Sequence, residues 1–233
     1  MLQSFIAPLR ACVFGASGAI GAGLVTALAA DEAVGEVLAG ARAPVAPAPK
    51  VIPFAFAYED DASLAAAAAR GPYDLVIVAT GELHEPEKSW RQQRAAAFAR
   101  AFENNTIGPA MIARHLLDAL PRDRRAVFAV LSAKVGSIGD NRLGGWHAYR
   151  AAKAALNMLV SNYAIELART RPQAIAVALH PGTVASKLTA PFRAAEDITT
   201  PADAAVNLLR VIDQLTSDDS GALISWDGTR LPY

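Results

Sequence analysis

Short apolar runs alternate along the chain with longer stretches rich in alanine and leucine. Most of the runs are apolar throughout, which is typical of strands buried on both faces of a parallel sheet. The expected strands are Ala11–Phe14, Glu36–Ala39, Val51–Phe56, Asp74–Ala79, Ala126–Leu131, Ala174–Leu179 and Ala222–Trp226. The expected helices are Ala19–Ala30, Ser63–Arg70, Gln92–Leu120, Tyr149–Thr170 and Pro201–Leu215. This alternation predicts an α/β fold, a single doubly wound domain over residues 1–233 with a seven-stranded parallel sheet flanked by helices.

Prolines interrupt this pattern in two places. Pro44, Pro47 and Pro49 alternate with other residues after the second expected strand, so an extended loop is expected there in place of a helix. Pro109 falls inside the helical stretch Gln92–Leu120 and has no N–H to donate to the carbonyl of Asn105, four residues earlier. A kink with a free carbonyl is expected at Asn105, where an ordered water can bind.

Composition narrows the class of protein. Of the 233 residues, 53% are hydrophobic and 19% are charged, which is a globular composition. Lys plus Arg and Asp plus Glu number 22 each, so no overall charge favours binding to nucleic acid or to a membrane surface. The single cysteine, Cys12, excludes an internal disulfide, and the scattered histidines offer no metal site. No apolar stretch is long enough to span a bilayer and no signal peptide is evident, so a soluble, cytoplasmic protein is expected.

A glycine-rich loop follows the first expected strand and opens the first expected helix. Its sequence runs Gly15-Ala16-Ser17-Gly18-Ala19-Ile20-Gly21. Glycines allow the backbone to approach a pyrophosphate, which then lies at the free N–H groups of the helix. The second expected strand leads into Arg42 with no carboxylate at its tip. A guanidinium suits a 2′-phosphate, which favours NADP and leaves NAD as the alternative; a solvated surface arginine is the simpler interpretation.

Tyr149 and Lys153 are the strongest catalytic candidates. Residues four apart lie on one face of a helix, one turn from each other. A phenol has a pKa of about 10, and a neighbouring ammonium lowers the cost of forming the phenolate. The pair is therefore suited to general acid/base chemistry, although the same spacing also arises by chance in helices.

Taken together, these motifs resemble the short-chain dehydrogenase/reductase family over essentially the whole chain. The resemblance also rests on Asn105-Thr106-Ile107-Gly108, on a serine-bearing turn after the fifth strand and on Pro181-Gly182-Thr183-Val184. Within the family, the segments Ser137–Trp146 and His180–Val184 are most similar to the C-factor and carbonyl-reductase branch. The resemblance implies a Rossmann fold and an NAD(P)-dependent oxidoreductase.

The family pattern implies roles for individual residues. Tyr149 would be the acid/base, and Lys153 would lower its pKa and hold the nicotinamide ribose. Asn105 would bind a water that links Lys153 to solvent, and a serine would orient the substrate oxygen. The implied cofactor-binding residues are Gly15, Ser17, Gly18, Ala19, Ile20, Gly21, Arg42, Ala79, Thr80, Gly81, Tyr149, Lys153, Pro181, Gly182 and Thr183.

The serine position departs from the family pattern. The usual pair of serines after the fifth strand reads Ser132-Ala133 here, with alanine at the catalytic place. Ser132 is the first candidate and Ser137 the second. Near the expected site, Lys134 is interpreted as a solvated loop lysine, and Trp146 either lines the substrate opening or packs.

The leading hypothesis is an NADP-dependent reductase that interconverts an aldehyde or ketone and its alcohol. Leu188 and Phe192, in the loop after Thr183, favour an apolar small-molecule carbonyl substrate. The alternative is a nucleotide-binding protein with a signalling or interaction role and little turnover. The resemblance leaves the oligomeric state open between monomer and a homo-oligomer, a dimer or tetramer.

Overall fold

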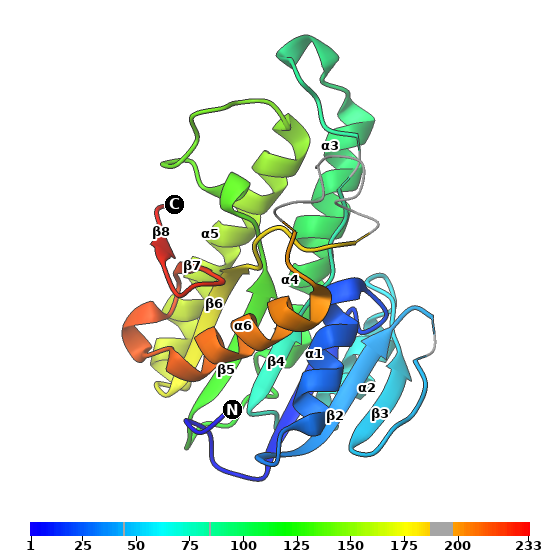
Figure 1. The fold of residues 1–233 in the computed structure, drawn as a ribbon, viewed down its shortest axis with the longest axis vertical. Helices are drawn as coiled ribbons and strands as arrows, with labels where there is room; N and C mark the ends of the chain where they lie inside the picture. The colour runs from blue at the N-terminus through cyan, green and yellow to red at the C-terminus, as the bar shows by residue number, and fades with distance from the viewer. Residues whose placement is uncertain (44, 84, 187–197) are drawn as a thin grey trace.

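The computed structural model describes residues 1–43, 45–83, 85–186 and 198–233. Within these residues, eight strands form one sheet, in the order β3-β2-β1-β4-β5-β6-β7-β8 (Figure 1). The strands are β1 (Leu9–Phe14), β2 (Val34–Ala41), β3 (Val51–Ala55), β4 (Leu75–Val78), β5 (Ala126–Leu131), β6 (Ala174–His180), β7 (Leu223–Ser225) and β8 (Arg230–Leu231). Strands β1 to β7 all run parallel to one another, and β8 pairs antiparallel with β7 at the edge of the sheet. The expected number of seven strands is wrong by one, because β8 was not predicted. A strand of two residues is too short to show a periodic pattern in the sequence.

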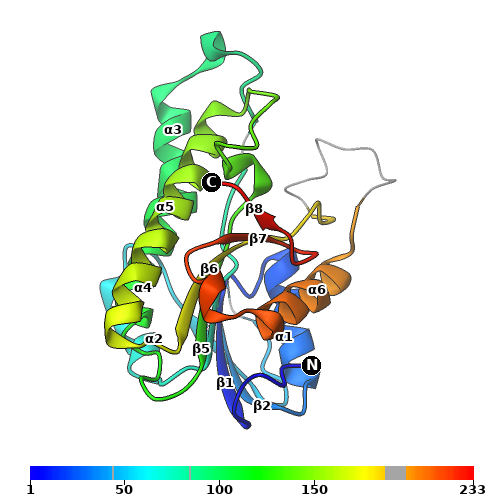
Figure 2. The same ribbon diagram turned by 90° about the vertical axis from the view of Figure 1, so that its left-hand side faces the viewer.

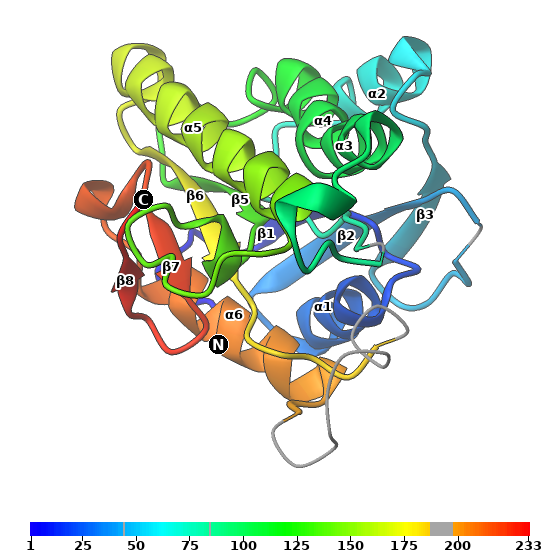
Figure 3. The ribbon, with the colours of Figure 1, turned by 90° about the horizontal axis from the view of Figure 1, so that it is seen from above.

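Helices cover both faces of the sheet. They are α1 (Ala19–Ala30), α2 (Asp61–Ala68), α3 (Ala95–Phe102), α4 (Gly108–Leu116), α5 (His147–Thr170) and α6 (Pro201–Gln214). In Figures 2 and 3, α1 and α6 lie on one face, and α2, α4 and α5 lie on the other. This arrangement confirms the predicted α/β class and its flanking helices.

The two faces explain why the strands are apolar throughout. In β1, Ala11 and Val13 pack with α1 and α6 in one hydrophobic cluster, whereas Cys12 and Phe14 pack with α2, α4 and α5 in the other. Successive side chains of a strand point to opposite faces, so a strand covered on both sides needs apolar residues at every position.

The expected helix Gln92–Leu120 is divided in the structure. A short 3-10 turn spans Trp90–Gln92, and α3 is followed by a π-helical segment, Glu103–Ile107, before α4 begins. The irregularity expected near Pro109 is therefore confirmed, in the form of a widened turn just before the proline. π-Helical turns inside α-helices are frequent at functional sites.

The direction of the crossovers fixes where a ligand can bind. β1 lies between β2 and β4: the chain first adds β2 and β3 on one side of β1, and then crosses back to add β4 and β5 on the other side. In such sheets, ligands bind outside the carboxyl ends of the strands at this switch point. The described part of the β2–β3 connection contains no helix, as its prolines predict. No helix among the described residues has the length and apolar character needed to cross a membrane.

Candidate active site

A pocket of about 500 Å³, here called the tyrosine pocket, opens at the carboxyl end of the sheet. Its residues come from loops after β4, β5 and β6 and from the starts of α1 and α5. They include Ile20, Leu83, Ser132, Ala133, Lys134, Val135, Asp140, Arg142, Leu143, Trp146, Tyr149, Arg150, His180, Pro181, Gly182, Thr183, Val184 and Ser186. Of the residues expected in the site, it brings together Ile20, Ser132, Tyr149, Pro181, Gly182 and Thr183.

Tyr149 and Lys153 meet on the face of α5 that points toward the sheet. The Lys153 Nζ lies 5.8 Å from the centre of the Tyr149 ring and donates a hydrogen bond of 2.8 Å to the carbonyl of Leu131. Burial lowers the pKa of Lys153 to about 7 and raises that of Tyr149 to about 12. In the absence of ligand, burial therefore favours the neutral form of both groups.

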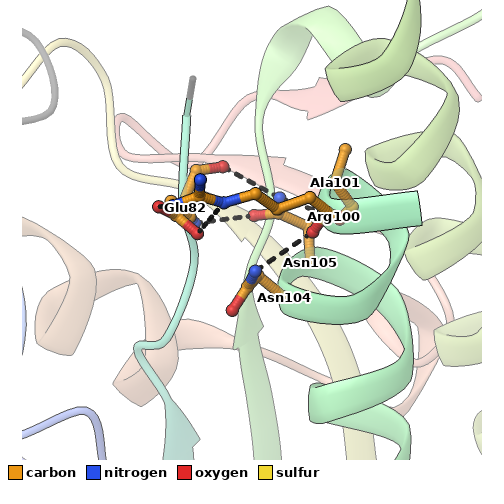
Figure 4. A network of polar contacts seen from close by, with 5 residues as sticks. All are labelled: Glu82, Arg100, Ala101, Asn104 and Asn105. Carbon is orange, nitrogen blue, oxygen red and sulfur yellow. Dashed lines mark hydrogen bonds and ion pairs between the residues drawn. The ribbon is translucent and has the colours of Figure 1, made fainter. Parts of the chain in front are cut away.

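Asn105 is fully buried in the π-helical segment and tethers the loop after β4 (Figure 4). Its Nδ2 donates to the carbonyls of Glu82, at 2.8 Å, and Ala101, at 3.0 Å, and its Oδ1 accepts from the Glu82 N–H at 3.0 Å. Arg100 pairs with the Glu82 carboxylate at 2.6 Å. A Cβ placed on Gly81 would lie 3.1 Å from Asn105 Oδ1 and 3.5 Å from Lys153 Nζ. The absence of a side chain at Gly81 thus leaves space between Asn105 and Lys153.

The two candidate serines face different parts of the structure. Ser132 is buried at the pocket wall, and its hydroxyl donates a 2.7 Å hydrogen bond to the Oδ1 of Asn157 on α5. The Ser137 hydroxyl instead donates to the carbonyl of Pro232 in the C-terminal segment. Ala133 lines the pocket beside Ser132. The structure therefore separates the candidates, with Ser132 at the pocket and Ser137 engaged by the C-terminal segment.

A second cavity of about 320 Å³, the glycine-loop pocket, lies over the carboxyl ends of β1, β2 and β4. Its lining includes seven residues expected to bind a cofactor, namely Gly15, Ser17, Gly18, Arg42, Ala79, Thr80 and Gly81. Ala19 and Gly21 lie in the first turn of α1 behind it.

The glycine loop fits a nucleotide phosphate. Gly15 has a φ of +89°, and a Cβ there would lie 2.9 Å from the Ala79 carbonyl carbon. A Cβ on Gly21 would lie 2.1 Å from the Gly15 carbonyl oxygen, so only glycine allows the helix to start this close to the strand. Gly18 begins α1 without a side-chain cap, and the first turn has no acidic residue. The helix N-terminus therefore presents N–H donors to the cavity without competition from a carboxylate.

Arg42 lies exposed at the end of this cavity, next to Tyr58. Burial raises the pKa of Tyr58, and the Arg42 charge partly opposes this rise. Among the described residues, no carboxylate forms an ion pair with Arg42. The guanidinium is thus available for an anionic group of a nucleotide.

Several residues of the tyrosine pocket were not predicted as site residues. Lys134 is exposed, as expected for a solvated loop lysine, and it also lines this pocket and lies 3.4 Å from the Asp140 carboxylate. Arg142 and Arg150 also line the pocket. Trp146 also lines the pocket and contacts Tyr149, with ring centres 6.3 Å apart. Leu188 and Phe192, the basis for an apolar substrate, lie outside the described residues.

The start of α5 is fixed from the loop after β4. The Trp146 N–H donates to the Glu87 carbonyl at 2.6 Å, and the buried Glu87 carboxylate accepts from the Ala148 N–H at 3.4 Å. Trp146 itself has a φ of +53°, following Gly144 and Gly145, which also have positive φ. This turn determines where the first residues of α5, Tyr149 among them, enter the pocket.

Comparisons with known proteins agree with this geometry. The family described as short chain dehydrogenase matches residues 10–197. A Rhodococcus protein named 1-hydroxy-2-glutathionyl-2-methyl-3-butene dehydrogenase is 37% identical over 58% of this chain and 58% of its own length. The C-signal of Myxococcus xanthus is 36% identical over 59% of this chain and 80% of its own. The alignment thus spans little more than half of the Rhodococcus relative.

Solved structures share the fold. An NADPH-bound carbonyl reductase from chicken fatty liver superposes with a TM-score of 0.85, covering 99% of this chain and 97% of that protein, at 24% identity. The family match extends from β1 through the glycine loop, Asn105, Tyr149 and Lys153 to the loop after β6. The chain belongs to the short chain dehydrogenase family and is an oxidoreductase of that family.

Proposed function

We propose that the protein is an NADP-dependent reductase of aldehydes or ketones, with Tyr149 as the proton donor. The observation that carries this proposal is the position of Tyr149 in an open pocket with Lys153 Nζ 5.8 Å from its ring centre. The glycine-loop pocket lies along the same edge of the sheet. The NADPH in the chicken carbonyl reductase of the same fold supports the choice of cofactor.

The two pockets would bind different parts of the cofactor. Gly15, Ser17 and Gly18 would hold its phosphates at the N-terminus of α1, and Arg42 would bind the 2′-phosphate. Gly182 and Thr183 would contact the nicotinamide at the border of the tyrosine pocket. When bound, NADPH supplies the hydride that reduces the carbonyl carbon.

Tyr149 would supply the proton. Its pKa of about 12 keeps the phenol protonated at neutral pH, so it can donate to the carbonyl oxygen of a substrate. As the proton leaves, Lys153 would stabilise the phenolate when its own amino group is protonated, because the ammonium lies within one helical turn of the tyrosine. Ala133 offers no hydroxyl beside the tyrosine, so Tyr149 would be the main hydrogen-bond donor to the substrate oxygen.

Consumption of NADPH with a panel of aldehydes and ketones tests this proposal, together with oxidation of the matching alcohols because the Rhodococcus relative is named a dehydrogenase. We expect Tyr149→Phe to lose nearly all turnover while it binds NADPH with unchanged affinity. Retained turnover in Tyr149→Phe would refute the role of the tyrosine.

A second candidate is a nucleotide-binding protein with a signalling role and little turnover. Two observations favour it, the alanine at position 133 and the 36% identity to the C-signal. This candidate predicts tight NADPH binding with no consumption of NADPH above the Tyr149→Phe background on any member of the panel.

A further inference from the structure

The charges around the tyrosine pocket are strongly one-sided. Three positive side chains, Lys134, Arg142 and Arg150, line it, and Asp140 is the one carboxylate among its described lining residues. The chain as a whole has a formal net charge of zero, so this excess is local. A pocket lined by an excess of one charge raises the local concentration of ligands of opposite charge.

The Asp140 carboxylate interacts with two of these three cations. It lies 3.4 Å from the Lys134 Nζ. It also raises the pKa of Arg150, against a larger lowering caused by burial. One carboxylate is therefore shared between a lysine and an arginine, and the Arg150 charge remains only partly balanced.

Arg142 has no carboxylate partner among the described residues. Its Nη1 donates to the carbonyls of Gly139, at 2.9 Å, and Asn141, at 3.2 Å. These contacts fix the guanidinium on the loop between β5 and α5 and leave its charge unpaired. The side chain is exposed at the mouth of the pocket, where a ligand can reach it.

Arg150 is more enclosed than Arg142. Its Nη1 donates to the carbonyl of Val135 at 3.1 Å, and its Nε is buried without an acceptor in the part of the chain that the structure describes. Arg150 as a whole is half-buried, but an enclosed N–H without an acceptor costs free energy, and an anion bound to the same guanidinium offsets part of that cost. The planar fork of an arginine matches the two oxygens of a carboxylate.

We infer that the tyrosine pocket selects carbonyl substrates that carry a carboxylate, bound by Arg142 and Arg150 with Lys134 as a further positive charge. This inference rests on the proposed function, because it names the substrate class of the same pocket. The ketone or aldehyde group would lie at Tyr149, and the carboxylate would lie toward the loop between β5 and α5. This inference differs from the expectation of an apolar substrate, which rests on Leu188 and Phe192 outside the described residues.

Paired substrates that differ only in charge test this inference. The pairs are 4-acetylbenzoate with its methyl ester and 6-oxoheptanoate with its methyl ester, each assayed for NADPH consumption. We expect kcat/KM to favour at least one acid over its ester by about tenfold, and the preference to fall as salt is raised. Equal rates, or faster reduction of the ester in both pairs, would overturn the inference.

Two variants test whether Arg142 and Arg150 cause the preference for the acid. Arg142→Gln and Arg150→Gln should each reduce the preference for the acid to about threefold or less, mainly through KM, since a charge-assisted contact is lost. Arg169→Gln, in the last turn of α5 and outside the pocket, is the matched control and should keep the wild-type preference. Arg142 lies on an exposed loop, so its variant remains informative if Arg150→Gln fails to fold. An unchanged preference in folded Arg142→Gln and Arg150→Gln would contradict the assignment.

Calorimetric binding of the same pairs to the NADPH-bound protein separates this inference from the proposed function. If the acid binds more tightly than its ester but neither is reduced, the reductase proposal fails and the anion site stands. If both are reduced equally in a Tyr149-dependent manner, the anion site fails and the reductase stands. If the acid neither binds nor reacts better than its ester in either pair, the inference is wrong.

Discussion

At the scale of single residues, burial shifts the pKa values of Tyr149 and Lys153 in opposite directions. A phenol with a pKa of about 12 retains its proton throughout the physiological range. A lysine with a pKa of about 7 changes its charge near neutral pH, whereas exposed lysines remain protonated there. Enclosure below the pocket causes both shifts, and the Leu131 carbonyl is the acceptor that holds the Lys153 amino group.

The depressed pKa of Lys153 should make the free energy of unfolding depend on pH. Between pH 7 and 10.5 the unfolded lysine binds a proton that the folded one does not, so its contribution to the free energy of unfolding rises with pH in that window and is constant below it. We expect Lys153→Met to be more stable than the wild type near pH 7. The wild type should recover by up to about 1.4 kcal/mol per pH unit as pH rises toward 10. Urea unfolding of both proteins at pH 7, 8 and 9 measures this, and parallel pH profiles would contradict it.

The hydrogen bond between Ser132 and Asn157 predicts a role for this serine in stability, in addition to the substrate-binding role that the family pattern implies. The serine hydroxyl donates to Asn157 in a buried pair, so Ser132→Ala leaves the Asn157 Oδ1 without its donor. We expect a loss of about 1–3 kcal/mol in the free energy of unfolding. The loss in kcat should be small beside that of Tyr149→Phe. Denaturant unfolding and steady-state assays measure the two effects, with Ser161→Ala on the same helix as the control; a collapse of kcat with unchanged stability would show that Ser132 acts on the substrate.

Arg42 controls the choice of cofactor in this account. Arg42→Gln removes the charge expected at the 2′-phosphate, and a charge-assisted hydrogen bond of this kind corresponds to about a tenfold change in affinity. We expect the Kd for NADPH to rise by that factor while the Kd for NADH changes little. Fluorescence titration with each nucleotide measures this, and Arg122→Gln, distant from the glycine-loop pocket, serves as the control. An equal loss for both nucleotides would contradict the assignment.

At the scale of elements, the π-helical segment between α3 and α4 links two parts of the site. It turns Asn105 toward the loop after β4, where two hydrogen bonds fix the main chain of Glu82, and a third reaches the Ala101 carbonyl in α3 (Figure 4). The same loop continues to Glu87, which holds the start of α5. A widened turn in one helix therefore positions the loop on which the helix of Tyr149 begins.

The buried and exposed parts of this network should differ in energy. We expect Asn105→Ala to lower the free energy of unfolding by about 2 kcal/mol, because a fully buried amide and two part-buried main-chain groups of Glu82 lose their hydrogen bonds. Arg100→Gln, which breaks the exposed ion pair with Glu82, should cost about 1 kcal/mol or less. Denaturant unfolding of both variants measures the difference. An equal cost would mean that the ion pair, not the amide, holds the loop.

Element prediction succeeded where one local rule decided the structure. Strands covered on both faces are apolar throughout, and the ranges Ala126–Leu131 and Ala19–Ala30 match the structure. The stretch Gln92–Leu120 was predicted as one helix because alanine and leucine favour helix along its length, but it is broken before Ala95 and at Glu103–Ile107. The proline indicated where the irregularity falls. Its π-helical form depends on the contacts of Asn105 with a distant loop, which periodicity does not report.

At the scale of the whole molecule, the sheet brings together residues that are far apart in the sequence. The glycine loop, Arg42, Tyr149 and Gly182 meet at its carboxyl edge, and their motifs predicted them without the structure. The positive wall of Arg142 and Arg150 was not predicted, because it depends on how one irregular loop folds over α5. A glycine motif can be recognised in the sequence, whereas the meeting of two arginines from a loop and a helix at one pocket cannot.

Transfer of deuterium from labelled NADPH to a ketone tests the central claim most directly. The wild-type protein is incubated with NADPH that carries deuterium at the transferable C4 position and with 4-acetylbenzoate, and the alcohol is analysed by mass spectrometry. We expect one deuterium on the carbinol carbon with the wild type, and none above background with Tyr149→Phe. NADPH binding without any labelled alcohol from this ketone, its ester or the carbonyl panel would contradict it and favour the nucleotide-binding alternative.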